Sequence, residues 1–231
     1  MALFFRGVVA ELQEALPFLP WLGVPFHYGH PVVLLYGPCF VPRPVRERVR
    51  REAARWGVAE EELVDFLGDL LGPLAPALLD APAGIHLPET VEEFWAAPEE
   101  LARRGFELLR VSPDPDMVEA AACFLGEHQE AIRALLSRHG FEVMPRVVAQ
   151  FLVLHELGHY VDWASAPDRE AWELEALSVS WDLSGHGYRA MPREARADRF
   201  ALAHLRMLYP RGPLSRLARG VLRLLAGGGD V

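Results

Sequence analysis

Two residue types are missing from this chain: it contains no lysine and no asparagine, so all 23 of its basic residues are arginine. A strong GC bias in the coding DNA favours arginine codons over those for lysine and asparagine. A thermophilic source also disfavours asparagine, because its amide is heat-labile. The composition therefore predicts a GC-rich or thermophilic source, and by itself it indicates no function.

Cysteine is scarce as well. The two cysteines, Cys39 and Cys123, lie too far apart in the sequence to form a C-x-x-C pair. A cysteine zinc site or a redox dithiol is therefore not expected. We expect two reduced thiols, both buried, because free cysteine is among the most buried residue types.

Long apolar runs are also absent. No uninterrupted hydrophobic segment reaches the length that spans a bilayer. The first residues meet Glu11 too soon to hold the apolar stretch of a signal peptide. Both absences predict a cytoplasmic protein that does not bind a membrane.

Acidic residues outnumber basic residues, and the formal net charge is −9. Nucleic acid is not expected as a partner, because phosphate contacts need clustered basic residues. Hydrophobic residues make up 51% of the chain and charged residues 24%, as in globular proteins. We expect one domain over residues 1–231, with an unassigned N-terminal part (1–111) and a helical part (112–231) that carries the site described below.

Hydrophobic periodicity and the placement of proline and glycine predict a mainly helical chain with short strands, and the expected α+β class depends in part on a family resemblance that is described below. Two strands are expected, one over residues 32–36 and an edge strand over residues 83–89 that Pro88 closes. Residues 165–191 form a polar stretch to which we assign no element. Helices are expected over approximately 45–56, 60–71, 92–110 with a break near Pro98, 114–140, a segment that begins at Pro145, 193–208 and 214–225.

The sequence His155-Glu156-Leu157-Gly158-His159 is an H-E-x-x-H motif. At spacing i, i+4 the two imidazoles project from one face of a helix and can converge on one ion. Glu156 is turned by about 100° around the helix, so it can reach a water on the metal without being a ligand. The flanking residues are strongly apolar, which favours a buried active-site helix over a surface helix with two solvated histidines.

A catalytic zinc site needs a third protein ligand and an open position. The position six residues beyond His159 is Ser165, which excludes the metzincin pattern. A later helix instead places Glu194 and Asp198 on one face at i, i+4. Glu194 is positioned as the third ligand, and Asp198 to accept a hydrogen bond from the second nitrogen of a liganding histidine. The alternative third ligands are Glu173, Glu175 and Asp182.

Together, H-E-L-G-H at 155–159 and E-x-x-A-D-x-F-A at 194–201 resemble the gluzincin metallopeptidases. They are most similar to the ImmA/IrrE-type cytoplasmic peptidases and to HtpX-like enzymes, whose membrane segments this chain lacks. The resemblance covers about residues 145–205. It implies that His155, His159 and Glu194 bind Zn²⁺, that Glu156 is the general base, and that Asp198 orients a ligand. It also implies a zincin-like core, with a small sheet against the active-site helix.

A glycine-rich segment just before the second helix contains His186 and Tyr188. Either side chain could donate a hydrogen bond to the oxyanion of a tetrahedral intermediate. An ordinary glycine-rich turn is the alternative interpretation of this segment.

Three further histidines and one basic segment are weaker candidates for functional sites. His27 and His30 are more typical of a surface or turn role than of a metal pair. His86 could line a cleft if its edge strand binds an extended substrate. The segment 214–225 is basic and amphipathic through Arg216, Arg219 and Arg223, and packing on the core is its favoured role.

These patterns predict a zinc metallopeptidase that hydrolyses a protein or peptide substrate through a metal-activated water. A catalytically weak or inactive zincin-fold protein with a regulatory or binding role is the alternative. A helical protein with chance histidines, which would bind no metal, is a third hypothesis. Neither the substrate nor the oligomeric state follows from the sequence.

Overall fold

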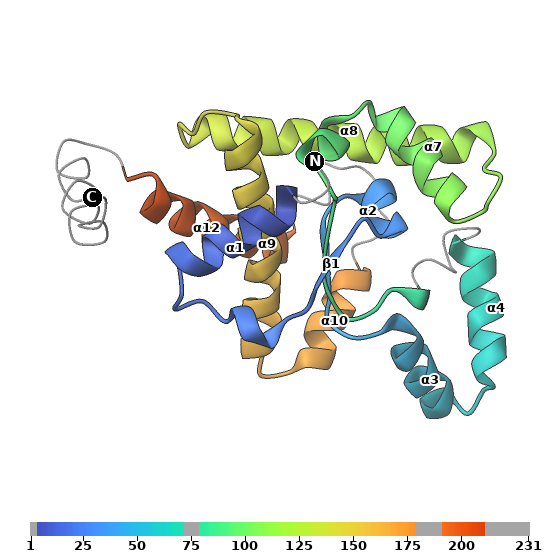
Figure 1. The fold of residues 1–231 in the computed structure, drawn as a ribbon. Helices are drawn as coiled ribbons and strands as arrows, with labels where there is room; N and C mark the ends of the chain where they lie inside the picture. The colour runs from blue at the N-terminus through green and yellow to red at the C-terminus, as the bar shows by residue number, and fades with distance from the viewer. Residues whose placement is uncertain (1–3, 72–78, 179–190, 211–231) are drawn as a thin grey trace.

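The structure, a computed structural model, describes residues 4–71, 79–178 and 191–210. Over these ranges the chain is mainly helical with one small sheet, which confirms the expected α+β class. The elements, shown in Figure 1, are in chain order α1 (Phe4–Ala15), the short 3-10 helix η1 (Trp21–Gly23), β1 (Phe26–Tyr28), α2 (Pro31–Tyr36), β2 (Cys39–Val41), α3 (Val45–Trp56), α4 (Glu60–Leu71), β3 (Gly84–Leu87), α6 (Val91–Trp95), α7 (Pro98–Leu108), α8 (Pro115–Arg138), α9 (Pro145–Ser165), α10 (Arg169–Ser178) and α12 (Pro192–Leu208).

The three strands are arranged in the order β1-β3-β2. β3 runs parallel to β1 and antiparallel to β2, and all four of its residues are buried. The expected edge strand is therefore the central strand, and that part of the prediction is wrong. Pro88 follows the last residue of β3 and so removes no donor from the strand itself, which leaves both edges of β3 open to a neighbour.

Residues 32–36, expected as a strand, lie in helix α2. The ring of His30 accepts a hydrogen bond from the backbone N–H of Val32, and Pro31 occupies the first helical turn. Gly37 then ends the helix with a positive φ of 83°. An apolar run this short fits a strand or a buried helix equally well, and here the cap and the proline decide for the helix.

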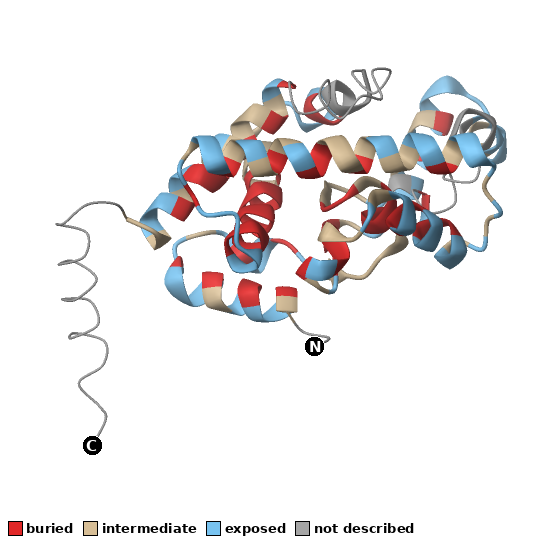
Figure 2. Ribbon diagram, turned by 90° about the horizontal axis from the view of Figure 1, so that it is seen from above, coloured by how far each residue is buried: buried red, intermediate tan, exposed pale blue. Residues whose placement is uncertain are grey.

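Helix α9 passes through the middle of the molecule and contacts α1, α12, α10 and two strands of the sheet. Every residue from Val147 to His159 is buried, and buried residues gather in the interior of the molecule (Figure 2). A helix that is covered on all sides needs apolar residues all round rather than on one stripe. This explains why the H-E-x-x-H motif lies in an almost continuous apolar run.

Helices α9 and α12 approach each other closely at Gly158. A Cβ atom added there would lie 3.1 Å from the Cα of Ala197 and 3.2 Å from the side chain of Phe200. Ala197 and Ala201 are fully buried. The expectation that small residues let these two helices meet is thus confirmed, and Gly158 has a packing reason within the motif.

Most predicted helix boundaries agree with the structure. Asp114 caps α8, Gly140 follows it with a positive φ of 68°, and proline opens both α9 and α12. The polar stretch 165–191, for which no element is expected, contains α10, and Asp168 caps its start by accepting a hydrogen bond from the N–H of Ala171. The segment 214–225 lies outside the described residues.

Two smaller expectations concern the cysteines and the membrane. Cys39 and Cys123 are both free thiols, but neither is fully buried, because Cys39 is half-buried and Cys123 is exposed. Its expected burial is wrong because it lies on a face of α8 that nothing covers among the described residues. Among the described residues no helix is both long and apolar enough to span a membrane.

Candidate metal centre

His155 and His159 lie one turn apart on the buried central helix α9. Their Nε2 atoms are 3.1 Å apart and their rings are nearly perpendicular. The two side chains are only 2% and 5% exposed. The i, i+4 spacing therefore does bring both imidazole nitrogens to one point, as the motif predicted.

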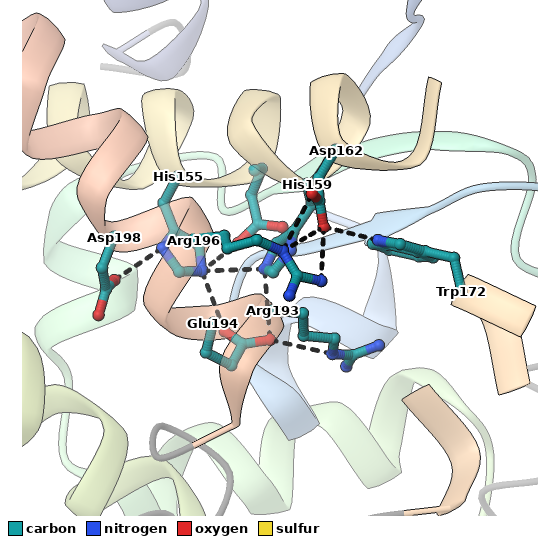
Figure 3. Close-up of polar contacts among 9 residues, drawn as sticks. His155, His159, Asp162, Trp172, Arg193, Glu194, Arg196 and Asp198 are labelled. Atoms are coloured by element: carbon teal, nitrogen blue, oxygen red, sulfur yellow. Dashed lines mark hydrogen bonds and ion pairs between the residues drawn. The ribbon is translucent and has the colours of Figure 1, made fainter. Parts of the chain in front are cut away.

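Glu194 reaches the same point from α12 (Figure 3). Its Oε2 atom is 3.1 Å from Nε2 of His155, and its Oε1 atom is 3.3 Å from Nε2 of His159. The side chain is completely buried. The structure thus brings the predicted third ligand to both histidines, from a position 35 residues later in the chain.

The side chain of Glu156 lies next to the group formed by His155, His159 and Glu194, and not between these residues. Its Oε1 atom is 4.0 Å from Nε2 of His155, and the residue is 3% exposed. One ligand atom from each of His155, Glu156 and His159 lies within 4.8 Å of the others, close enough for an ion. A carboxylate at this distance can exchange a proton with a small molecule that occupies the centre.

Asp198 contacts the far side of the His155 ring. Its Oδ1 atom is 2.9 Å from Nδ1 of His155. Because a carboxylate accepts hydrogen bonds, this contact holds a proton on Nδ1 and turns Nε2 toward the centre. The predicted orienting residue therefore lies next to a predicted ligand, on the face of α12 that it shares with Glu194.

The centre is rich in negative charge, since three carboxylates surround two imidazoles. Burial opposes a charged His155, yet its contacts with Asp198 and Glu194 raise its pKa to about 9. Burial likewise disfavours an ionised Glu194, but the neighbouring His159 and His155 hold the pKa of that carboxyl well below its usual range. Without a metal, then, a proton on His155 balances part of the charge, and a dication can take its place.

A second polar network, which sequence reasoning missed, joins the two helices next to the centre (Figure 3). Arg196 donates from Nε to both oxygens of Asp162, at 3.0 and 2.9 Å. The indole N–H of Trp172 donates to the same carboxylate at 2.7 Å. The sequence contained one signal: Asp162 stands three residues after the second histidine, where the metzincin pattern has glycine.

Arg193 is the other residue that was missed. Its Nε atom lies 3.3 Å from Oε1 of Glu194, and its guanidinium carbon lies 5.8 Å from the ring centre of Trp172. The side chain is 13% exposed. A fixed positive charge on the second oxygen of Glu194 favours the ionised, metal-binding form of that carboxylate.

The other candidate site residues are not brought to the centre by the described structure. Glu173 is buried but accepts a hydrogen bond from the indole of Trp163 and pairs with Arg43, each at 3.0 Å. Three side chains, those of Asp182, His186 and Tyr188, lie outside the described residues, as does the side chain of Glu175.

His27, His30 and His86 form a separate group on the sheet, which we call the sheet histidines. His27 and His86 are register partners on β1 and β3, with ring centres 4.8 Å apart, and the ring of His30 lies 5.0 Å from that of His86. The possibility that His86 lines a cleft at a sheet edge is wrong, because the residue is fully buried in the central strand. His30 has the predicted turn role, as the cap of α2.

Two of the sheet histidines, His86 and His30, have lowered pKa values. Nε2 of His86 lies 2.8 Å from the carbonyl of Pro82, and Nε2 of His27 lies 3.0 Å from that of Ala83. A carbonyl only accepts, so both nitrogens carry protons. Burial lowers the pKa of His86 to about 4, and burial together with His27 lowers the pKa of His30.

Comparisons of this chain with protein-family models, with curated proteins and with solved structures found no match. The resemblance to gluzincins therefore stays a prediction from two short motifs, and the case for function depends on the geometry of the centre.

Proposed function

We propose that this chain is a zinc-dependent metallopeptidase with a zincin-like core, which hydrolyses a protein or peptide substrate. One observation carries the proposal. Two imidazoles from α9 and one carboxylate from α12 meet in a buried position, with donor atoms 3.1 to 3.3 Å apart.

The donor set and its spacing suit zinc. Zinc binds imidazole nitrogen at 2.0–2.1 Å, so a tetrahedral site separates two ligand atoms by about 3.3 Å. The observed separations of 3.1 and 3.3 Å are close to that value. Two histidines and one carboxylate also leave a fourth position open, which is typical of catalytic rather than structural zinc sites.

The roles of the chain's own residues follow from this arrangement. When bound, zinc supplies Lewis-acid chemistry, polarising a carbonyl and lowering the pKa of water. Glu156 takes the proton from the attacking water and delivers it to the nitrogen of the leaving amine. Asp198 keeps Nδ1 of His155 protonated, so that Nε2 stays available as a ligand. Peptide hydrolysis needs these steps and no other cofactor.

The test is a comparison of Glu156→Gln with the wild type and with a matched control, Glu93→Gln. Glu93 is also a buried glutamate, but it caps α6 and pairs with Arg104, away from the centre. The zinc-loaded wild type is expected to cleave members of a random peptide library, with products identified by mass spectrometry. Glu156→Gln should bind one zinc and cleave about 10²–10⁴-fold more slowly, because the proton carrier is lost. Glu93→Gln should retain cleavage.

Three outcomes would contradict the proposal in different ways. Stoichiometric zinc with no cleavage by the wild type would favour the alternative, a zinc-binding regulatory protein. Absence of stoichiometric zinc from the wild type would reject both functions. Equal cleavage by Glu156→Gln and the wild type would reject the assigned role of Glu156.

A further inference from the structure

Four arginines and three glutamates line a pocket between α3 and α10, which we call the arginine pocket. Its lining residues are Arg43, Arg48, Arg51, Glu52, Arg55, Glu170 and Glu173. The chain as a whole is acidic, with a net charge of −9. A pocket in which arginines outnumber carboxylates is therefore a local reversal of charge.

Glu173 holds two of these arginines in place. Its buried carboxylate pairs with Nε of Arg43 at 3.0 Å, and its backbone carbonyl accepts from Nη1 of Arg48 at 3.4 Å. The guanidinium of Arg43 also lies 6.0 Å from the ring centre of Trp163. Arg43 precedes α3 and Arg48 lies within its first turns, and both arginines thus contact Glu173.

Arg48 is half-buried, and none of the carboxylates whose side chains the structure describes lies within ion-pair distance of its guanidinium. The other pocket arginines differ: Arg51 pairs with Glu47 at 2.8 Å and Arg55 with Glu52 at 3.9 Å. An arginine of this kind binds an oxyanion with charge-assisted hydrogen bonds.

The pocket lies next to the metal centre. Glu173 directly follows Trp172, whose ring is 6.4 Å from that of His159 and whose N–H donates to Asp162 on α9. Trp163, which donates to Glu173, stands one turn beyond His159. The arginine pocket and the centre are therefore flanked by the same end of α9.

Strand β2 connects the two places. Among the described residues it pairs only with β3, and a strand edge with no strand partner is the kind that an extended peptide can pair with. Strand β2 packs against α9, and the ring centre of Phe40 in β2 lies 5.8 Å from that of Tyr160, the residue that follows His159. Arg43 comes four residues after Cys39, a span of about 13 Å in an extended chain.

We propose that the arginine pocket binds an acidic side chain of the polypeptide substrate, about four residues from the bond that is hydrolysed. The side chain's carboxylate takes the free N–H groups of Arg48 and its neighbour Arg43. This inference rests on the proposed function, because it assigns a specificity pocket to the same cleavage.

The test starts from a library peptide that the zinc-loaded protein cleaves, with every acidic residue changed to glutamine. A single glutamate is then placed in this parent peptide, one position at a time, at each position up to about six residues on either side of the cleaved bond. One position about four residues away should raise kcat/KM about tenfold, as expected for one charge-assisted contact. In zinc-loaded Glu156→Gln, whose slow cleavage allows binding to be measured, the same glutamate peptide should bind about tenfold more tightly than the parent.

Arg48→Gln should bring this glutamate-to-glutamine ratio close to one. Arg51→Gln, which changes an exposed residue paired on its own helix, should lower the ratio without disturbing the contact with Glu173. The matched control is Arg46→Gln, because Arg46 is on the same helix but pairs with Asp80 outside the pocket. Arg46→Gln should keep the full ratio.

Distinct results would overturn the inference. If the parent peptide is cleaved and no glutamate position changes its rate, the pocket is not a substrate subsite, while the proposed peptidase function stands. If inorganic phosphate binds Glu156→Gln more tightly than the glutamate peptide and Arg48→Gln abolishes that binding, the pocket takes a free anion. If no library peptide is cleaved, the proposed function itself fails, and this inference fails with it.

Discussion

Two groups of histidines in this molecule have opposite environments. His155 and His159 meet carboxylates, and the pKa of His155 is raised to about 9. The sheet histidines meet one another and backbone carbonyls, and the pKa of His86 is lowered to about 4. His155, His159 and His86 are all buried, so burial alone does not decide the behaviour of a histidine. The neighbouring groups do: the carboxylates around His155 raise its pKa, whereas burial and the adjacent imidazoles lower the pKa of His86 and His30, at His30 against the opposing charge of Asp80.

Two closely spaced histidines in a sequence can correspond to two different structures. His27 and His30 are spaced three residues apart, and His155 and His159 four apart. The first pair spans a turn, and its members bond a backbone carbonyl and a backbone N–H. The second pair lies on one helix, and both members contact Glu194.

The largest effect should come from removing one ligand of the centre. His159→Gln should lower zinc affinity by more than about a hundredfold, since structural zinc sites yield roughly 3 kcal/mol per ligand. His27→Gln, the matched change among the sheet histidines, should leave one zinc bound per chain. Isothermal titration of metal-free protein measures both values. A loss of zinc binding in His27→Gln would show that the two groups of histidines do not differ in metal binding.

A smaller effect is expected from the residue that orients the centre. Asp198→Asn should weaken zinc binding by about 10–100-fold, because an amide holds the Nδ1 proton of His155 less firmly than a carboxylate does. Zinc competition with a chelating dye measures this change. Unchanged affinity in Asp198→Asn would show that the 2.9 Å contact to His155 does not serve metal binding.

The smallest expected effect concerns pH and the sheet histidines. The pKa of His86 is about 4 in the folded chain and near 6.5 in the unfolded chain. Between these values the unfolded chain binds a proton that the folded chain does not. The His86 contribution is therefore constant above pH 6.5, and stability falls as the pH drops from 6.5 toward 4.

His86→Gln should remove this part of the acid sensitivity and keep a side-chain donor for the carbonyl of Pro82. Urea unfolding of both proteins at pH 7.5 and pH 4.5 should show a loss smaller in the variant by about 2 kcal/mol. Parallel losses in the two proteins would mean that His86 does not titrate in this window.

The local elements were largely predictable, because their signals lie within a few residues. Proline at the first turn, Asp114 as a cap and Gly140 after the last turn predicted the ends of helices that the structure contains. The prediction failed where a local signal was ambiguous. Residues 32–36 form a helix because His30 caps it, and a histidine cap is not among the common ones.

The centre was predictable to the extent that it lies on one helix. The pairing of His155 with His159 follows from 3.6 residues per turn and needs no tertiary structure. The contact of Glu194 with both histidines does need it, and Gly158 and Ala197 show how it arises: small residues let α12 approach α9. The small residues can be read from the sequence, but the helix against which they pack cannot be predicted from it.

Local sequence is enough to predict the helical character, the i, i+4 histidine pair and the glutamate and aspartate one turn apart on a second helix. These features depend on helix periodicity and capping residues, which act over a few residues. The tertiary structure, in contrast, makes β3 the central strand, lowers the pKa of His86, and brings Arg48 to the carbonyl of Glu173, 125 positions later in the chain. These outcomes depend on packing between distant segments, where burial and neighbouring charge, rather than local spacing, set the free energy of each side chain.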